Sequence, residues 1–142
     1  MRKISILGVV IGSVADIALS GVLGMAILSS AVPATNVSPE VYQQLTEQAM
    51  LNDLRLFFYV FLSGSACSIL GGYIAAKIAK RAELLNGALA SFLCVSFGIE
   101  SLVSGGSSFP LWLELLSVIL SPALATLGGY LCLNFKRVPE NA

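Results

Sequence analysis

The chain has 142 residues, of which 56% are hydrophobic and 11% are charged, and its mean hydropathy is +0.87 with a net charge of zero. An average soluble domain carries about 25% charged residues, so this chain has too few charges to cover a soluble globule. Disordered chains are rich in charge and poor in large apolar residues, which excludes that class as well. A neutral chain also lacks the basic field that attracts nucleic acid. We therefore expect one integral membrane domain over residues 1–142.

Four apolar stretches are each long enough to cross a bilayer as a helix, for which about 20 residues are needed. They cover residues 4–32, 54–78, 84–103 and 111–135, and Asp16 interrupts the first. The fold class predicted from this pattern is all-α, a bundle of four transmembrane helices in a multi-pass membrane protein.

The basic residues favour one orientation in the membrane, because they gather on the cytoplasmic side. With four spans, seven of the eight basic residues fall on one face, namely Arg2, Lys3, Lys77, Lys80, Arg81, Lys136 and Arg137. Only Arg55 falls on the other face, and the connection over residues 33–53 has acidic residues but no basic ones. Both termini are therefore expected in the cytoplasm.

The N-terminus has an alternative interpretation. Met1-Arg2-Lys3, the following apolar run and Ser29-Ser30-Ala31 resemble a signal peptide with a small-residue cleavage site. The core of a signal peptide has about 7–15 apolar residues, whereas this run is longer and contains Asp16. We expect an uncleaved first span. Cleavage would leave three spans and remove Asp16.

A short helix is expected in the connection between the first two spans, starting at Ser38-Pro39-Glu40. Serine caps free N–H groups, proline fits the first turn, and glutamate suits the positive end of the helix dipole. This helix is either a connector packed on the bundle or, in a more specific interpretation, a lid or a surface for a partner.

A short motif occurs twice. Leu70-Gly71-Gly72-Tyr73 in the second span returns as Leu127-Gly128-Gly129-Tyr130 in the fourth, and each copy precedes a Lys-Arg pair. The repeat predicts two helical hairpins in parallel orientation, although convergence on small residues and an interfacial tyrosine would give the same pattern.

Small residues also recur every four positions in each span, and in lipid such residues let helix backbones approach closely. We expect helix packing, within one chain or in an oligomer, at Gly8, Gly12, Gly24, Gly64, Gly72 and Gly129.

Asp16 is the strongest candidate for chemistry, because a carboxyl group at membrane depth is costly and by default indicates function. It lies near the middle of the first span, and Ser68 and Ser121 fall at similar depth in the second and fourth spans. These three residues form the candidate proton or cation site. The alternative is a hydrogen-bonded aspartic acid that locks helix packing.

Three further charged residues, Arg55, Glu100 and Glu114, lie near the opposite ends of their spans from the basic clusters. We expect an ion pair or small network among them, which would offset their desolvation. The alternative is an acidic mouth for a cation.

No enzyme is predicted, and neither is a cofactor or a bound metal. The sequence has no histidine, three cysteines that all lie within spans, and no Cys-x-x-Cys pair, nucleophile motif or phosphate loop. The cysteines are best explained as small packing residues.

The segment 71–79, followed by Asn86-Gly87-Ala88-Leu89, resembles a pattern in small uncharacterised bacterial four-span membrane proteins with a Gly-Gly-Tyr-containing second span. The resemblance covers about a fifth of the chain; it implies a bacterial inner (plasma) membrane and no assigned activity. In length and in one acidic residue the chain is also similar to the small multidrug transporters. Asp16 would correspond to their coupling carboxylate, although they use glutamate there.

Two functions follow as hypotheses. The first is a structural or accessory role, exerted through helix packing with a second copy or another membrane protein in the lipid bilayer, and without nucleic acid. The alternative is a small proton- or cation-coupled transporter that uses Asp16.

Overall fold

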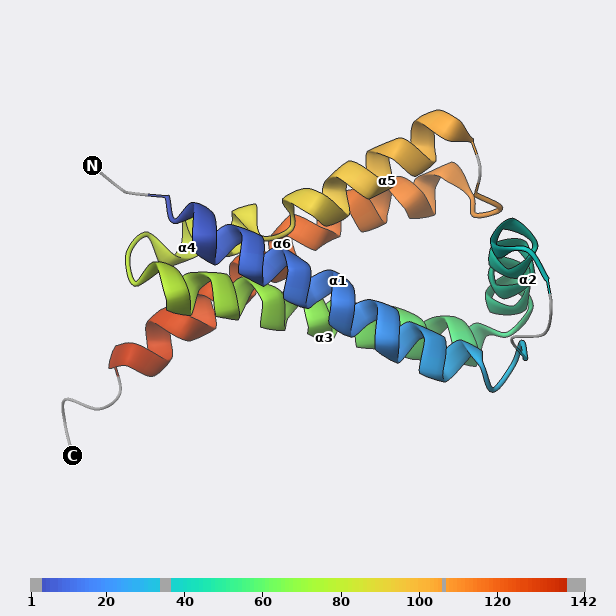
Figure 1. Ribbon diagram of the computed structural model, residues 1–142, viewed down its shortest axis with the longest axis horizontal. Helices are drawn as coiled ribbons and strands as arrows, with labels where there is room; N and C mark the ends of the chain where they lie inside the picture. Colours follow the sequence, from blue (N-terminus) through green and yellow to red (C-terminus); the bar gives the residue numbers. More distant parts are fainter. Residues whose placement is uncertain (1–3, 34–36, 106, 138–142) are drawn as a thin grey trace.

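The computed structural model describes residues 4–33, 37–105 and 107–137, with the side chain of Arg137 left out. Over these residues the fold is all-helical, without any β-strand (Figure 1). The helical segments are α1 Ile6–Leu28, α2 Pro39–Asn52, α3 Leu54–Ala79, α4 Glu83–Leu89, α5 Phe92–Ser104 and α6 Leu111–Arg137. Arg2 and Lys3, which were expected on the same face as the other basic residues, lie outside the described residues.

Four helical stretches are long and apolar enough to cross a membrane, namely α1, α3, α4 together with α5, and α6. The predicted bundle of four membrane-spanning helices is thus confirmed as the fold class, in keeping with a multi-pass membrane protein. The helix expected after Ser38 is α2: Pro39 occupies its first turn, and the Ser38 hydroxyl accepts a hydrogen bond from the N–H of Val41 at 3.4 Å.

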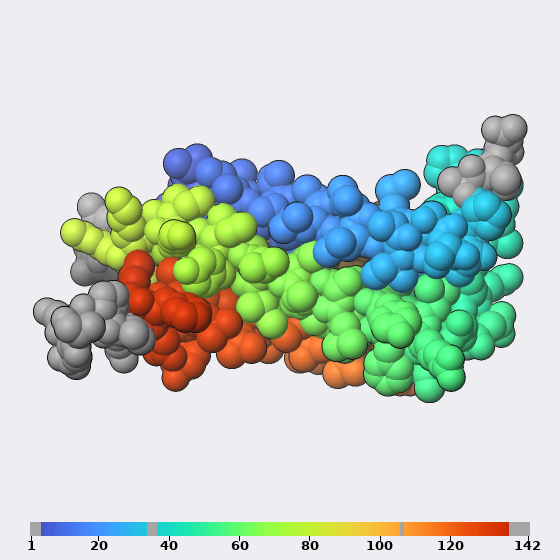
Figure 2. Space-filling view, turned by 90° about the horizontal axis from the view of Figure 1, so that it is seen from below, coloured from blue at the N-terminus to red at the C-terminus, as the bar shows by residue number. Residues whose placement is uncertain are grey.

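The bundle has two ends of different character (Figure 1). The turn between α3 and α4 carries Lys80 and Arg81, and α6 ends beside it; we call this the basic end. At the opposite end, α2 lies across the space between the ends of α1 and α3 and the loop that joins α5 to α6; we call this the α2 end. Along the face seen in Figure 2, α1, α3 and α6 lie side by side.

At the basic end, α1 packs directly on the backbone of α3. A Cβ atom added at Gly8 would lie 2.8 Å from the carbonyl oxygen of Ala75, and one at Gly12 would lie 2.6 Å from that of Gly71. Glycine is therefore needed for these helices to come so close, as the small-residue row predicts.

The two copies of the repeated motif pack against each other where α3 and α6 cross. A Cβ at Gly72 would overlap the backbone of Ala125, and a Cβ at Gly128 would overlap the backbone around Ile69. At Gly129 the added atom would lie 2.7 Å from the carbonyl oxygen of Glu83. The helix order α1–α3, then α4/α5–α6, gives two hairpins whose second helices run in the same direction (Figure 1).

The third span is broken at Ala90 and Ser91, between α4 and α5, where the sequence predicts a single apolar stretch. A broken helix at membrane depth leaves backbone groups that need partners from neighbouring helices. The carbonyl oxygen of Ala90 accepts such a bond from the Ser13 hydroxyl of α1 at 2.6 Å. Ser13 therefore stabilises the break from the adjacent helix.

Toward the α2 end the pair of α1 and α3 diverges from the pair of α5 and α6 (Figure 1), and two glycines of the predicted rows have no partner helix within the described chain. A Cβ at Gly24 or at Gly64 would meet no atom within 4 Å beyond its own chain neighbours and the adjacent backbone of its own helix. Among the described residues these two glycines therefore do not pack on another helix of the chain, and packing in an oligomer stays a prediction. The reason is geometric: a row of residues four apart drifts around a helix of 3.6 residues per turn, so a partner follows it for only part of its length.

Candidate functional site

Asp16 lies where three of the spans meet, and its side chain is almost completely buried, with 2% of the residue exposed. The Ser68 hydroxyl of α3 lies 3.2 Å from each of its carboxyl oxygens. The Cys94 thiol of α5 lies 3.3 Å from Oδ2. Asp16 is thus held by two donors from two other helices.

Two features of the backbone create this cluster. A Cβ at Gly71 would lie 2.8 Å from the Cβ of Asp16, so glycine at this position lets the aspartate sit against α3 beside Ser68. The break at Ala90 and Ser91 comes three residues before Cys94 and redirects α5. The sequence places Ser68 and Cys94 near the depth of Asp16, but it does not fix the directions in which they face. The structure shows that both face Asp16.

A cavity of about 400 Å³ extends from this cluster toward the α2 end. We call it the α5–α6 cavity. Its walls include Cys94, Ser101, Ser117 and Ser121, and two carboxyl groups, those of Glu47 and Glu114, lie on it as well. None of the residues that line it is basic. Its polar groups are therefore hydroxyls, a thiol and carboxyls, a set suited to a polar or cationic occupant.

Ser121 is placed differently from the prediction. Its hydroxyl has no hydrogen bond to Asp16; the oxygen is buried and has no hydrogen-bond partner among the described residues. Ser121 instead lines the α5–α6 cavity and a second cavity of about 180 Å³ between α3 and α6, the α3–α6 cavity. Of the predicted trio, the structure brings Asp16 and Ser68 together and leaves Ser121 on the wall between two spaces.

The network expected among Arg55, Glu100 and Glu114 is not formed in the part of the chain that the structure describes. Glu114 lines the α5–α6 cavity, and Glu100 borders a separate space between α2 and α5. Arg55 is exposed at the start of α3. Its backbone N–H group donates a hydrogen bond of 2.9 Å to the side-chain carboxyl group of Asp53. Arg55 lies on the arm formed by α1 and α3, which diverges at this end from the arm of α5 and α6 that carries Glu100 and Glu114 (Figure 1).

Glu47 is a site residue that sequence reasoning missed. It lies on α2 with 5% of its surface exposed, although α2 is the most polar helix of the chain. Its Oε2 accepts a hydrogen bond of 2.7 Å from the N–H of Ser108, and its Oε1 accepts one of 2.9 Å from the Gln43 amide. Nothing in the local pattern distinguishes Glu47 from the exposed Glu40, whose pKa is lowered by hydrogen bonds from its own N–H and from Ser38.

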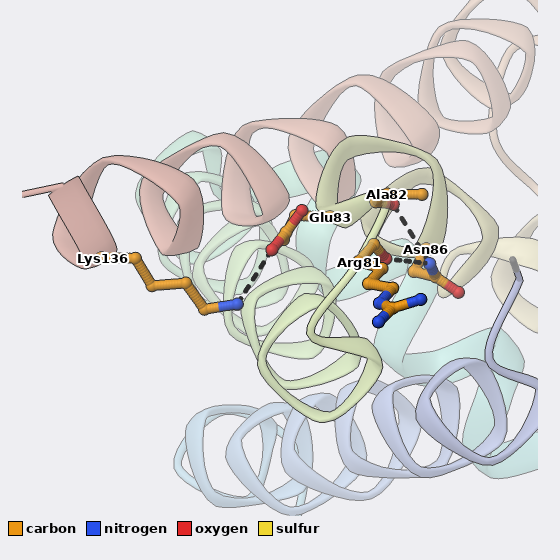
Figure 3. Close-up of polar contacts among 5 residues, drawn as sticks. All are labelled: Arg81, Ala82, Glu83, Asn86 and Lys136. Carbon is orange, nitrogen blue, oxygen red and sulfur yellow. Dashed lines mark hydrogen bonds and ion pairs between the residues drawn. The ribbon is translucent and has the colours of Figure 1, made fainter. Parts of the chain in front are cut away.

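Asn86 is the second residue that was missed, and it organises the basic end. It is fully buried in α4, and its side-chain oxygen accepts a hydrogen bond of 2.8 Å from the N–H of Ser5. Its amide nitrogen donates to the carbonyl oxygens of Arg81 at 3.0 Å and Ala82 at 3.1 Å (Figure 3). One side chain thus ties the start of α1 to the turn between α3 and α4.

An ion pair completes the basic end. The Lys136 ammonium of α6 lies 2.9 Å from a carboxyl oxygen of Glu83 at the start of α4 (Figure 3). It is the one ion pair among the described residues. Together with Asn86 it closes the end of the bundle that carries the basic residues.

The chemistry open to the Asp16 cluster is narrow. Within the described ranges no three His, Cys, Asp or Glu side chains come together as a metal ion would require. A carboxyl group with a hydroxyl and a thiol as donors can hold a proton, attract a cation, or lock three helices together.

Comparison with known proteins adds no further constraint: no family model matches the chain, and no match is found among curated proteins or solved structures.

Proposed function

We propose that this membrane protein has an accessory role, and that a transmembrane helix of another membrane protein packs into the open part of its bundle. The proposal rests on the part of the small-residue rows that no helix of this chain covers among the described residues. Gly8, Gly12 and Gly72 are filled by neighbouring helices, whereas Gly24 and Gly64 face open space. In lipid, an exposed row of this kind is a surface on which another helix packs closely.

The α3–α6 cavity is where such a helix would pack. Gly64, Ser65 and Ser68 line one wall and Ser117 and Ser121 line the other, with apolar residues such as Phe61 and Leu124 around them. A membrane helix that packs into the α3–α6 cavity would contact small residues at the centre of the cavity and apolar residues at the edges of the cavity. That arrangement matches the composition of known contacts between membrane helices.

A photo-crosslinking residue placed at position 64 tests the proposal in native membranes. We expect one discrete adduct with another protein, and we expect it to disappear when Ser117→Leu narrows the α3–α6 cavity from the opposite wall. The matched control is the same residue at Tyr59, which lies on the same helix but is exposed and does not line the cavity. Equal adducts from both positions, or none from position 64, would refute the accessory role.

A second candidate is proton- or cation-coupled transport through Asp16. A specific observation supports it: Asp16 lies beside a broken span, and the α5–α6 cavity connects its Cys94 neighbour with two further carboxyl groups. Broken helices and carboxyl groups at membrane depth are features of transporter sites. The similarity in size to the small multidrug transporters belongs with this candidate.

A carbodiimide, which modifies protonated carboxyl groups in apolar surroundings, separates the transport role of Asp16 from a packing role. For transport we expect modification of Asp16 in the folded protein, detected by mass spectrometry and slowed by added Na⁺. Asp16→Asn is the control for the assignment of the modified residue. An Asp16 that stays unmodified until the protein unfolds is a packing residue.

A further inference from the structure

The mouth of the α5–α6 cavity is formed partly by α2, a helix outside the four spans. Glu47 of α2 lies on the lining of the cavity, at the opposite end from Cys94 and its contact with Asp16. In Figure 1, α2 crosses the α2 end between the two diverging arms. Movement of α2 would therefore change access to the cavity.

The attachment of α2 is uneven. On one side it packs chiefly on α3 and is joined to it through Asp53, whose extended backbone (φ −121°, ψ 101°) interrupts the helix. The carboxyl group of Asp53 caps α3, accepting from the N–H of Arg55 at 2.9 Å, so the start of α3 is fixed independently of α2. Asp53 thus has the position of a hinge.

On the other side, one hydrogen bond within the described ranges connects α2 to the loop before α6: Ser108 donates to Glu47 at 2.7 Å. A space of about 380 Å³ separates α2 from α5 and is lined by Gln43, Gln44 and Glu100, among others. The loop itself is also held to α3, because the rings of Phe109 and Phe57 lie 6.4 Å apart. Loss of the bond to Glu47 would thus remove the attachment of α2 to the loop and leave the loop in place.

We propose that α2 is a hinged lid over the α5–α6 cavity, with Asp53 as the hinge and the hydrogen bond between Glu47 and Ser108 as the latch. A carboxylate that accepts from a backbone N–H forms one of the stronger hydrogen bonds in proteins, so one contact is enough to hold the lid. The proposal concerns access alone and holds for either function proposed above.

The native cysteines test the lid without added labels. Cys94 lines the cavity, whereas Cys67 and Cys132 are buried with 1% and 2% exposed. In lipid nanodiscs, a small neutral methanethiosulfonate reagent should modify Cys94 at least about tenfold faster in Glu47→Ala than in the parent protein. That is the size expected for the loss of one charge-assisted hydrogen bond. A neutral reagent is used because removal of a carboxylate changes the local concentration of a charged one.

Thr46→Ala is the matched control: Thr46 is the buried neighbour of Glu47, but its hydroxyl donates within α2, to Gln43. The lid is supported if Glu47→Ala accelerates the modification of Cys94 but not of Cys67 or Cys132, and if Thr46→Ala leaves the rate at Cys94 unchanged. Equal rates in Glu47→Ala and the parent overturn it. If all three cysteines of Glu47→Ala react together, the variant has unfolded and Ser108→Pro decides, since it removes the donor of the latch and leaves α2 unchanged. Selective acceleration at Cys94 in Ser108→Pro supports the lid, and an unchanged rate overturns it.

Discussion

The two ends of this bundle use the same kinds of residues in opposite ways. At the basic end, glycines bring backbones into contact, Asn86 ties α1 to the turn between α3 and α4, and Lys136 pairs with Glu83. At the α2 end, glycines of the same rows face open space, and the polar side chains line cavities. A row of small residues therefore permits close packing without enforcing it. The crossing of the helices decides which part of the row is used.

The largest effect should come from the contrast between Gly72 and Gly64 on α3. Gly72→Ala places a methyl group on the backbone of Ala125, and we expect it to lower the free energy of unfolding by about 3 kcal/mol, the upper part of the range for overpacking. Gly64→Ala meets no atom within 4 Å and should raise that free energy by up to about 1 kcal/mol, because alanine favours the helix.

Thermal unfolding in detergent, followed by the fluorescence of Trp112, compares these two variants directly. Similar destabilisation by both would mean that the two ends are packed alike, contrary to the structure.

An intermediate effect is expected at the break in the third span. Ser13→Ala removes the hydrogen bond to the carbonyl oxygen of Ala90 and should cost about 1–2 kcal/mol of unfolding free energy, because the freed group is buried. Ser20→Ala is the control on the same helix, since the Ser20 hydroxyl donates only to its own helix, at Ile17. Denaturant titration should show a loss for Ser13→Ala alone; equal losses would place the stabilisation elsewhere.

The smallest effect should come from the ion pair at the basic end. The side chain of Lys136 is 41% exposed, so Lys136→Gln should cost no more than about 1 kcal/mol. The difference between this variant and the parent should shrink further as salt is added, because ions screen an exposed pair. Unfolding at low and at high ionic strength measures it. A large loss that is independent of salt would show that the pair is a buried component of the end.

The helices could be predicted because their signals are local. A run of about 20 apolar residues is enough to indicate each span, and Ser38 with Pro39 is enough to indicate the start of α2. The similar depth of Asp16 and Ser68 could also be counted along their helices, but depth alone did not fix their contact, because Ser121 shares that depth and has no bond to Asp16.

The remainder depends on the directions in which helices diverge, and no local pattern encodes them. Arg55, Glu100 and Glu114 share a depth but lie on different elements, so depth alone could not show that they stay apart. Glu47 and Asn86 acquire their roles from partners 61 and 81 residues away in the chain. The break at Ala90 was hidden as well, since both sides of it are apolar and helix-forming.

The close crossing of α3 and α6 at the repeated glycines has a mechanical consequence: it acts as a fulcrum. From Gly72 to Leu54 is 18 residues, or about 27 Å of helix at 1.5 Å per residue. With such a lever, a rotation of about 5° at the crossing moves the far tips of the helices by about 2 Å. Small adjustments at this close contact are thereby magnified at the α2 end.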